Sequence, residues 1–271
     1  IFGFDEPYLN GRSKLFNVEN QFGTLSRIKD KVCKFVEQQL SSSALGDNKL
    51  KYYNMQGRVQ IDLMKVVQRD YKLSSYKLDS VAENFLNSKV KNKISSTEIE
   101  IDQVKDLSIG NYIKLIDDNG DAINDSEKYK IISIDDSIIT IDKEVEEKVV
   151  KWSLAKDDVS PNDIFRLQKG SSADRKIIAE YCVQDCALVN KLMARLCIVT
   201  NNIGMANVCH VPLSYLFFRG QGIKIFSLVA KYCRMKKFLI PVVKKKKEEG
   251  ERIGYEGATV FKPNIGFYKR P

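Results

Sequence analysis

Tyr181 and Asp185 lie one helical turn apart in a stretch, 165–192, that has the pattern of a capped helix. Ser171 and Asp174 have the spacing of a capping box, with Asp in place of the usual Glu or Gln. Residues four apart share a helix face, so the tyrosine and the carboxylate point the same way. A carboxylate beside an apolar stripe needs a cationic partner, and a metal ion is one such partner. Spacing alone still favours an ordinary helix with an Asp at the edge of its stripe.

The wider sequence gives this pair a context. The segment QKGSSADRKIIAEYCVQDC (168–186) resembles the third exonuclease motif of family-B DNA polymerases, which is Y-x-x-x-D. The first residues, IFGFDEPYL, resemble the second exonuclease motif, whose core is the Phe4-Asp5 pair. Between them, residues 57–86 (GRVQIDLMKVVQRDYKLSSYKLDSVAENFL) are similar to the segment that joins these motifs.

Two later segments extend the resemblance. Residues 211–241 (VPLSYLFFRGQGIKIFSLVAKYCRMKKFLIP) are similar to the family's run from exonuclease into polymerase. Residues 255–268 (YEGATVFKPNIGFY) are similar to its Y-x-G-G/A motif. The five segments occur in the family's order and resemble most the polymerases of large DNA viruses. The resemblance covers nearly the whole chain except about residues 92–158.

The resemblance implies metal-dependent 3′→5′ removal of misincorporated nucleotides. Two divalent ions held by carboxylates can activate water and neutralise phosphate charge, and carboxylates suit Mg²⁺ or Mn²⁺. Asp5 and Asp185 would be metal ligands, and Tyr181 would position the attacking water. The family's D-x-E carboxylates lie upstream of the Phe4-Asp5 pair, which only three residues precede here. We therefore expect the chain by itself to bind metal poorly and to hydrolyse DNA slowly or not at all.

The same resemblance implies contacts with DNA. Tyr255, Gly257 and Ala258 would contact the single-stranded template, because small residues let the backbone approach a phosphate or base closely. Arg219 and Lys224 are weaker candidates for phosphate contacts. Lys plus Arg number 44 against 35 Asp plus Glu, a formal charge of +9, which suits a polyanionic partner without specifying one. The charged run KKKKEEGE (244–251) favours a solvated loop, with DNA contact as a secondary interpretation.

Other classes are disfavoured. No apolar run approaches the roughly 20 residues of a membrane span, and the first residues lack a signal-peptide pattern. Six cysteines form no C-x-x-C pair, and His210 is the single histidine, which argues against a zinc site. Reduced, mostly buried thiols are expected instead. Asp62 and Asp79 are better explained as a strand end or a helix cap than as ligands.

The pattern predicts a mixed α/β fold. We expect strands at 1–9, 50–53 and 58–63, and helices at 25–40, 63–69, 79–86, 171–198 and 214–238. Residues 41–48 and 201–211 read as connections. Residues 92–158 alternate Ile, Tyr, Val and Lys around turn signals at 119–120 and 135–136, so they predict a small antiparallel β unit. The DDNGD sequence (117–121) lacks the later ligands of a calcium loop and predicts a hairpin turn.

The resemblance thus implies a ribonuclease-H-like exonuclease domain at 1–210, with the β unit inserted, and the mainly helical start of a polymerase domain at 211–271. The expected partners are primer-template DNA, a single-stranded 3′ end and deoxynucleoside triphosphates, with a processivity factor as a further candidate and no membrane. The expected setting is intracellular, at a viral replication site in host cytoplasm or nucleus. Two alternatives stay open: a stand-alone DnaQ-like exonuclease, and a non-catalytic DNA-binding module.

Overall fold

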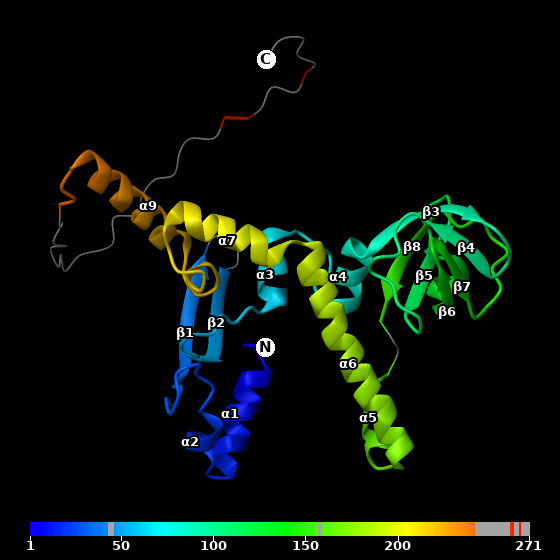
Figure 1. Ribbon diagram of the computed structural model, residues 1–271, viewed down its shortest axis with the longest axis horizontal. Helices are drawn as coiled ribbons and strands as arrows, with labels where there is room; N and C mark the ends of the chain where they lie inside the picture. The colour runs from blue at the N-terminus through cyan, green and yellow to red at the C-terminus, as the bar shows by residue number, and fades with distance from the viewer. Residues whose placement is uncertain (43–45, 157–158, 242–260, 263–265, 267–271) are drawn as a thin grey trace.

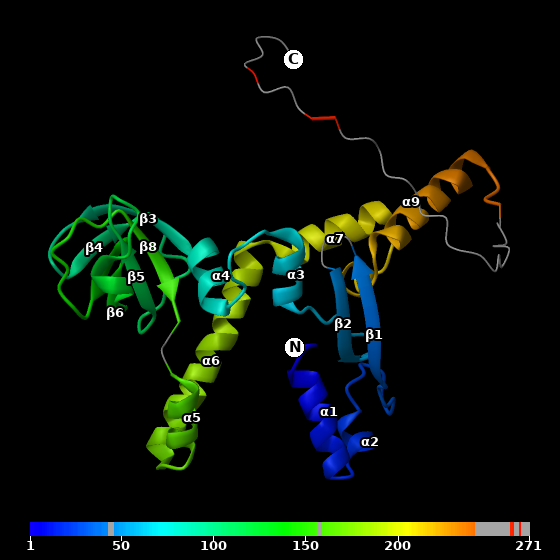
Figure 2. The ribbon, with the colours of Figure 1, turned by 180° about the vertical axis from the view of Figure 1, so that it is seen from behind.

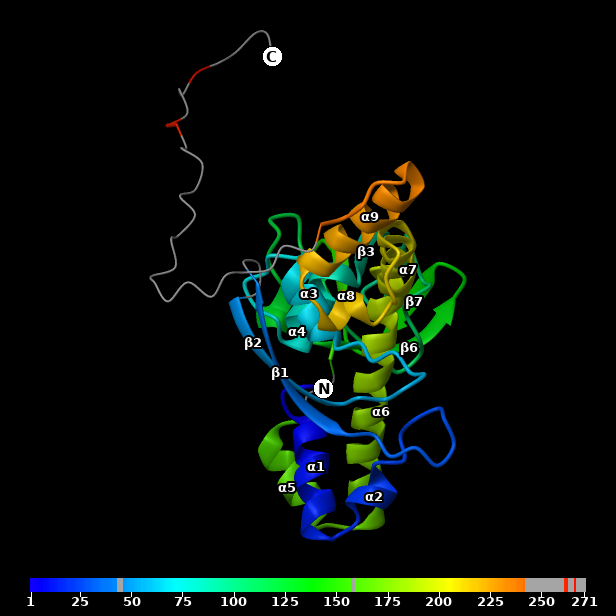
Figure 3. The same cartoon turned by 90° about the vertical axis from the view of Figure 1, so that its left-hand side faces the viewer.

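The computed structural model describes residues 1–42, 46–156, 159–241, 261–262 and 266. Figure 1 shows a helix and hairpin group beside the N-terminus, a barrel at the opposite side, and helices that join the two. Figure 2 shows the same order from behind, and Figure 3 shows the molecule from the side of the helix and hairpin group. Helices combined with antiparallel sheets confirm the mixed α/β class. The described strands form a hairpin and a barrel, so the ribonuclease-H-like mixed sheet stays a prediction.

The N-terminal group differs from its prediction. Residues 1–9 do not form a strand, because α1 (Asp5–Leu15) begins there, with acidic residues in its first turn and basic residues in its last, as the helix dipole favours. The short helix α2 (Glu19–Phe22) follows. The expected helix at 25–40 is also wrong. Asp30 has a left-handed φ of 59°, which a continuous helix does not allow, and the chain enters a strand at Phe35.

That strand, β1 (Phe35–Ser42), pairs antiparallel with β2 (Gly46–Tyr53). Most of the 41–48 connection is therefore strand, with the tip, 43–45, outside the described residues. The strand expected at 50–53 is confirmed as part of β2. Aromatic side chains anchor the hairpin, since the rings of Phe35 and Tyr53 meet edge to face at 5.2 Å.

Two short helices come next, α3 (Leu63–Asp70) and α4 (Leu78–Phe85), and both confirm the prediction. The strand expected at 58–63 is wrong. Its last residues instead lead into the cap of α3, where the Asp62 carboxylate accepts a hydrogen bond from the Lys65 amide at 3.4 Å. The cap interpretation of Asp62 is thus confirmed.

The β unit is a closed antiparallel barrel of strand order β3-β4-β7-β6-β5-β8. Its strands are β3 (Asn87–Lys93), β4 (Glu98–Ile101), β5 (Tyr112–Ile116), β6 (Tyr129–Asp135), β7 (Ile138–Ile141) and β8 (Lys151–Ala155). Alternate apolar residues fill its interior, including Ile99, Ile113, Ile131 and Trp152. Closure leaves no unpaired sheet edge. The DDNGD turn is confirmed, because the Asp117 carboxylate accepts amide hydrogen bonds from Asn119 and Asp121, both at 2.9 Å.

The remaining helices are α5 (Pro161–Gln168), α6 (Ser172–Arg195), α7 (Ile198–Cys209), α8 (Tyr215–Phe218) and α9 (Gln221–Lys236). The connection expected at 201–211 is mostly α7, whose buried stripe includes the polar residue Asn202 and the small residues Ala206 and Cys209, which weakens its apolar pattern. The helix expected at 214–238 is broken, because Arg219 is extended and Gly220 caps α9. The thiols are free as expected, but Cys182, Cys186 and Cys197 are exposed rather than buried.

The main core joins the barrel to the helices. Leu188, Leu192 and Leu196 of α6 are buried with Val81 and Ala82 of α4 and with the barrel interior. The other half of α6 projects away from this core, and Ile177 there is exposed. Figure 1 shows this half as an arm that carries α5 at its end. Tyr181 and Asp185 lie where the arm leaves the core.

Candidate functional site

The start of α6 is fixed by the predicted capping box. The Ser171 hydroxyl accepts a hydrogen bond from the Asp174 amide at 3.2 Å, and the Asp174 carboxylate accepts one from the Ser171 amide at 2.7 Å. The Ser171 hydroxyl also donates to that carboxylate, and these hydrogen bonds hold the pKa of Asp174 below its usual value. The helix that carries Tyr181 and Asp185 therefore has a defined register from its first turn.

Tyr181 and Asp185 meet at one cation, Lys156. This lysine directly follows β8, and its Nζ lies 2.9 Å from Oδ2 of Asp185. The same ammonium lies 4.5 Å from the centre of the Tyr181 ring. The side chains of Lys156 and Asp185 are 21% and 28% exposed, so the pair is only partly hydrated. The prediction that Tyr181 and Asp185 lie on one face of the helix is confirmed. The cationic partner of Asp185 is a lysine.

The electrostatics of this cluster favour charged Lys156. Burial lowers its pKa, but the contacts with Tyr181 and Asp185 and the charge of Asp185 raise it by more, so the net pKa lies above the usual value. A small cavity of about 50 Å³ adjoins the pair, between the barrel and α6. Lys191 also lines it, and burial lowers the pKa of that lysine. The lining of this cavity thus includes one carboxylate, Asp185, and two lysines.

Asp5 lies elsewhere. It is the first residue of α1, its side chain is 63% exposed, and its carboxylate lies 3.3 Å from the ammonium of Ile1. Figure 1 shows α1 beside the β1–β2 hairpin and α6 in a separate arm. The structure therefore brings Tyr181 and Asp185 together and leaves Asp5 apart from them. The next residue, Glu6, is the buried acid of this segment and accepts a hydrogen bond from the Tyr53 amide.

The divalent metal implied by the resemblance does not fit these residues as they stand. No group of three or more His, Cys, Asp or Glu side chains in the described part of the chain is placed to hold a metal ion. The charge of Asp185 is already matched by Lys156, and Asp5 is remote from both. What this cluster does by itself is orient a carboxylate and a phenol around one ammonium.

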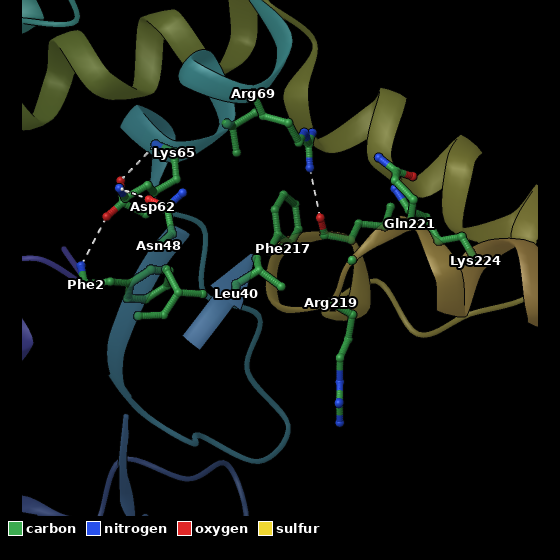
Figure 4. A pocket seen from close by; sticks show the side chains of 14 residues that line it. Phe2, Leu40, Asn48, Asp62, Lys65, Arg69, Phe217, Arg219, Gln221 and Lys224 are labelled. Atoms are coloured by element: carbon green, nitrogen blue, oxygen red, sulfur yellow. Dashed lines mark hydrogen bonds between the residues drawn. The ribbon is translucent and has the colours of Figure 1, made fainter. Parts of the chain in front are cut away.

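The expected DNA contacts divide into two sets. Tyr255, Gly257 and Ala258, like the charged run 244–251, lie outside the described residues. Arg219 and Lys224 line one cavity, but Figure 4 shows the Arg219 side chain directed away from the others. The Arg219 guanidinium lies 5.4 Å from the ring centre of Tyr215. Arg219 is exposed, whereas Lys224 is partly buried. Lys224 lies near Arg69, a residue that the sequence analysis did not predict as part of a site.

Comparison with known sequences supplies the decisive observation. Residues 1–81 match the sequence model described as DNA polymerase family B, exonuclease domain, and residues 211–271 match the one described as DNA polymerase family B. Together the two matches cover more than half of the chain. The chain belongs to the family-B DNA polymerases. Tyr181 and Asp185 fall between the two matched segments, so these matches leave their roles untested.

Individual family-B relatives match most or all of the chain. It is 53% identical over 268 residues, 99% of its length, to the DNA polymerase of Pyramimonas orientalis virus. It is 37% identical over 88% of its length to that of Acanthamoeba polyphaga mimivirus. The DNA polymerase delta catalytic subunit of Dictyostelium discoideum is 31% identical over the whole chain. The chain spans 22%, 17% and 18% of the lengths of these three relatives.

Two residues of these sites were not anticipated. Lys156 follows a strand and sits in no motif, so nothing in the sequence connected it to Asp185 across 29 positions. Arg69 sits at the end of α3, and its Nη1 donates to the carbonyl of Leu216 at 2.9 Å. Both contacts join segments far apart in the chain, which local periodicity does not reveal. Within the described part of the chain, no helix is both long and apolar enough to cross a membrane.

Proposed function

We propose that this chain is part of a DNA-directed DNA polymerase that replicates DNA and proofreads by 3′→5′ exonucleolytic hydrolysis. The observation that carries the proposal is the pair of matches to one family, at 1–81 for its exonuclease domain and at 211–271 for its polymerase. We assign residues 1–210 to the exonuclease domain and 211–271 to the start of the polymerase domain. The second match argues against a stand-alone exonuclease, which has no need of a polymerase segment.

Within the exonuclease, Asp185 and Tyr181 act at the 3′ end. By the family resemblance, Asp185 and Asp5 would be ligands of Mg²⁺ or Mn²⁺ and Tyr181 would orient the attacking water, which requires Asp5 to lie closer to Asp185 than it does in this structure. Family-B exonuclease domains depend on metal in general, and the described residues do not assemble the full ligand set by themselves. The support from geometry is that Tyr181 and Asp185 lie on one side of α6 and both contact Lys156.

The substrates and partners follow from the proposed activity. They are primer-template DNA, a frayed single-stranded 3′ end and deoxynucleoside triphosphates, with a processivity factor as an additional partner. Tyr255, Gly257 and Ala258 contact the template strand. The viral relatives support replication inside an infected cell, in cytoplasm or nucleus.

The test uses protein translated from the complete reading frame that contains this chain. Asp185→Asn and Tyr181→Phe are each compared with Glu180→Gln, which removes a charge from the exposed neighbour of Tyr181. Release of a mispaired, 3′-labelled nucleotide is measured in Mg²⁺. We expect Asp185→Asn to slow release by about 100-fold or more, Tyr181→Phe to slow it less, and Glu180→Gln to leave it unchanged. Primer extension should persist in all three.

The alternative of a non-catalytic DNA-binding module has one observation in its favour. Asp185 is neutralised by Lys156, as a carboxylate with a purely structural role would be. If the wild-type protein binds DNA but releases no nucleotide in Mg²⁺ or Mn²⁺, this alternative replaces the proofreading assignment.

A further inference from the structure

A cavity of about 100 Å³ lies between the β1–β2 hairpin, α3 and the start of α9 (Figure 4). This is several times the roughly 10–15 Å³ that a single water needs. Its apolar wall is formed by Phe2, Leu40, Leu50, Val66, Leu216 and Phe217. The cavity is lined by residues of both family-matched segments, 1–81 and 211–271, so it sits at the junction of the exonuclease and polymerase parts.

Three cationic side chains face this junction. Lys65 and Arg69 come from α3, and Lys224 comes from α9, and all three are partly buried. The lining holds one carboxylate among its described residues, Asp62, which accepts hydrogen bonds from the backbone nitrogens of Ile1 and Phe2 at 2.9 and 3.1 Å. The positive charge of the cavity therefore exceeds the negative charge available to it.

Hydrogen bonds hold Arg69 and Lys65 in place but do not use all of their N–H donors. Arg69 donates from Nε and Nη2 to Asp70 and from Nη1 to the Leu216 carbonyl, which uses three of its five N–H groups. Lys65 donates to Asn48 at 2.8 Å. No carboxylate of the described residues forms an ion pair with Lys224. Burial and then the charge of Arg69 lower the pKa of Lys224. The charge of Asp70 raises it by less, and that carboxylate is already bonded to Arg69.

We propose that this cavity binds a phosphodiester group of a DNA strand, with Lys224 as its principal contact and Arg69 and Lys65 completing the positive field. A tetrahedral oxyanion supplies the charge that these cations lack and accepts several hydrogen bonds at once. Gly220 and Gln221, at the start of α9, also line the cavity. This inference rests on the proposed function, because a strand that moves between editing and synthesis must cross this junction.

The experiment measures lysine acetylation by mass spectrometry, in protein from the complete reading frame, with and without single-stranded oligo-dT. Lys236, an exposed lysine on the same helix outside the cavity, is the internal reference. We expect DNA to reduce acetylation of Lys224 several-fold more than that of Lys236. Equal protection of the two lysines would overturn the proposal.

Binding measurements then test the role of charge. Lys224→Gln should weaken oligo-dT affinity by about tenfold and reduce the slope of log affinity against log salt by about 0.7, the value for one phosphate of a single strand. Lys236→Gln should change the affinity less than threefold, and Lys224→Arg should retain it. Circular dichroism confirms that each variant is folded. Equal losses in Lys224→Gln and Lys236→Gln would refute a specific pocket.

Two competitors separate the sources of phosphate. If thymidine triphosphate or inorganic phosphate protects Lys224 while oligo-dT does not, the site takes free phosphates and the phosphodiester assignment is wrong. Protection of Lys224 does not depend on exonuclease activity. Asp185→Asn should therefore strongly reduce nucleotide release and leave the protection of Lys224 by oligo-dT intact. Weaker oligo-dT binding by Lys224→Gln with normal nucleotide release would support the cavity as a DNA site and leave the assignments of Asp185 and Tyr181 unchanged.

Discussion

The contact between Lys156 and Asp185 predicts a measurable coupling energy. The two charged groups are 2.9 Å apart and their side chains are 21% and 28% exposed. Fully exposed pairs contribute about 0.2–1 kcal/mol, and hydrogen bonds to charged groups about 1.5–3 kcal/mol. A partly buried pair should lie between these ranges, so we expect a coupling of about 1–2 kcal/mol in the free energy of unfolding.

The assay is urea unfolding of Lys156→Met, Asp185→Asn and the double variant, which together form a double-mutant cycle. The matched control is the exposed pair Lys176 and Glu180 of the same helix, at 3.4 Å, for which a few tenths of a kcal/mol are expected. The pKa of Lys156 is raised in the folded state, so its stabilisation is present below the unfolded pKa of about 10.5 and is lost as pH rises through the folded value. A coupling near zero at pH 7, or one unchanged at pH 12, would refute the reasoning.

Three further predictions concern the helix and the metal. Leu192→Ala, at a fully buried position, should cost about 2–5 kcal/mol in urea unfolding, whereas Val183→Ala, at an exposed position of the same helix, should cost almost nothing. Ser171→Ala should cost about 1 kcal/mol by loss of the capping box, and Ser171→Thr should recover most of it; no difference between them would argue against the cap. Millimolar Mg²⁺ should shift the melting temperature of the 271-residue chain by less than a degree, since its described residues assemble no metal site, and a shift of several degrees would contradict this.

Local signals predicted the elements that local interactions determine. The capping box and the spacing of apolar residues placed α6 correctly, and alternation with turn residues predicted an antiparallel β unit where the structure has the barrel. The Ser160-Pro161 pair is an equally local signal for the start of α5 that the prediction did not use. These interactions lie within a few residues, so a sequence displays them directly.

Pairing and long-range contact account for the errors. The 25–40 segment has apolar spacing compatible with a helix, but from Phe35 onward its backbone groups bond to β2. α7 was missed because Asn202 and Cys209 occupy its buried face. Lys156 and Arg69 became candidate functional residues only through contacts with Asp185 and Leu216, which no spacing rule connects.

The most direct test of the central claim is the sequence of the native gene on both sides of this chain. Membership in a proofreading polymerase predicts a D-x-E motif upstream of Ile1, which would supply the missing metal ligands, and an acidic S-L-Y-P-S-type motif soon after Pro271. A start codon next to Ile1 together with a stop codon next to Pro271 would contradict the account. Synthesis by this protein would then be excluded, and DNA binding would become the leading interpretation.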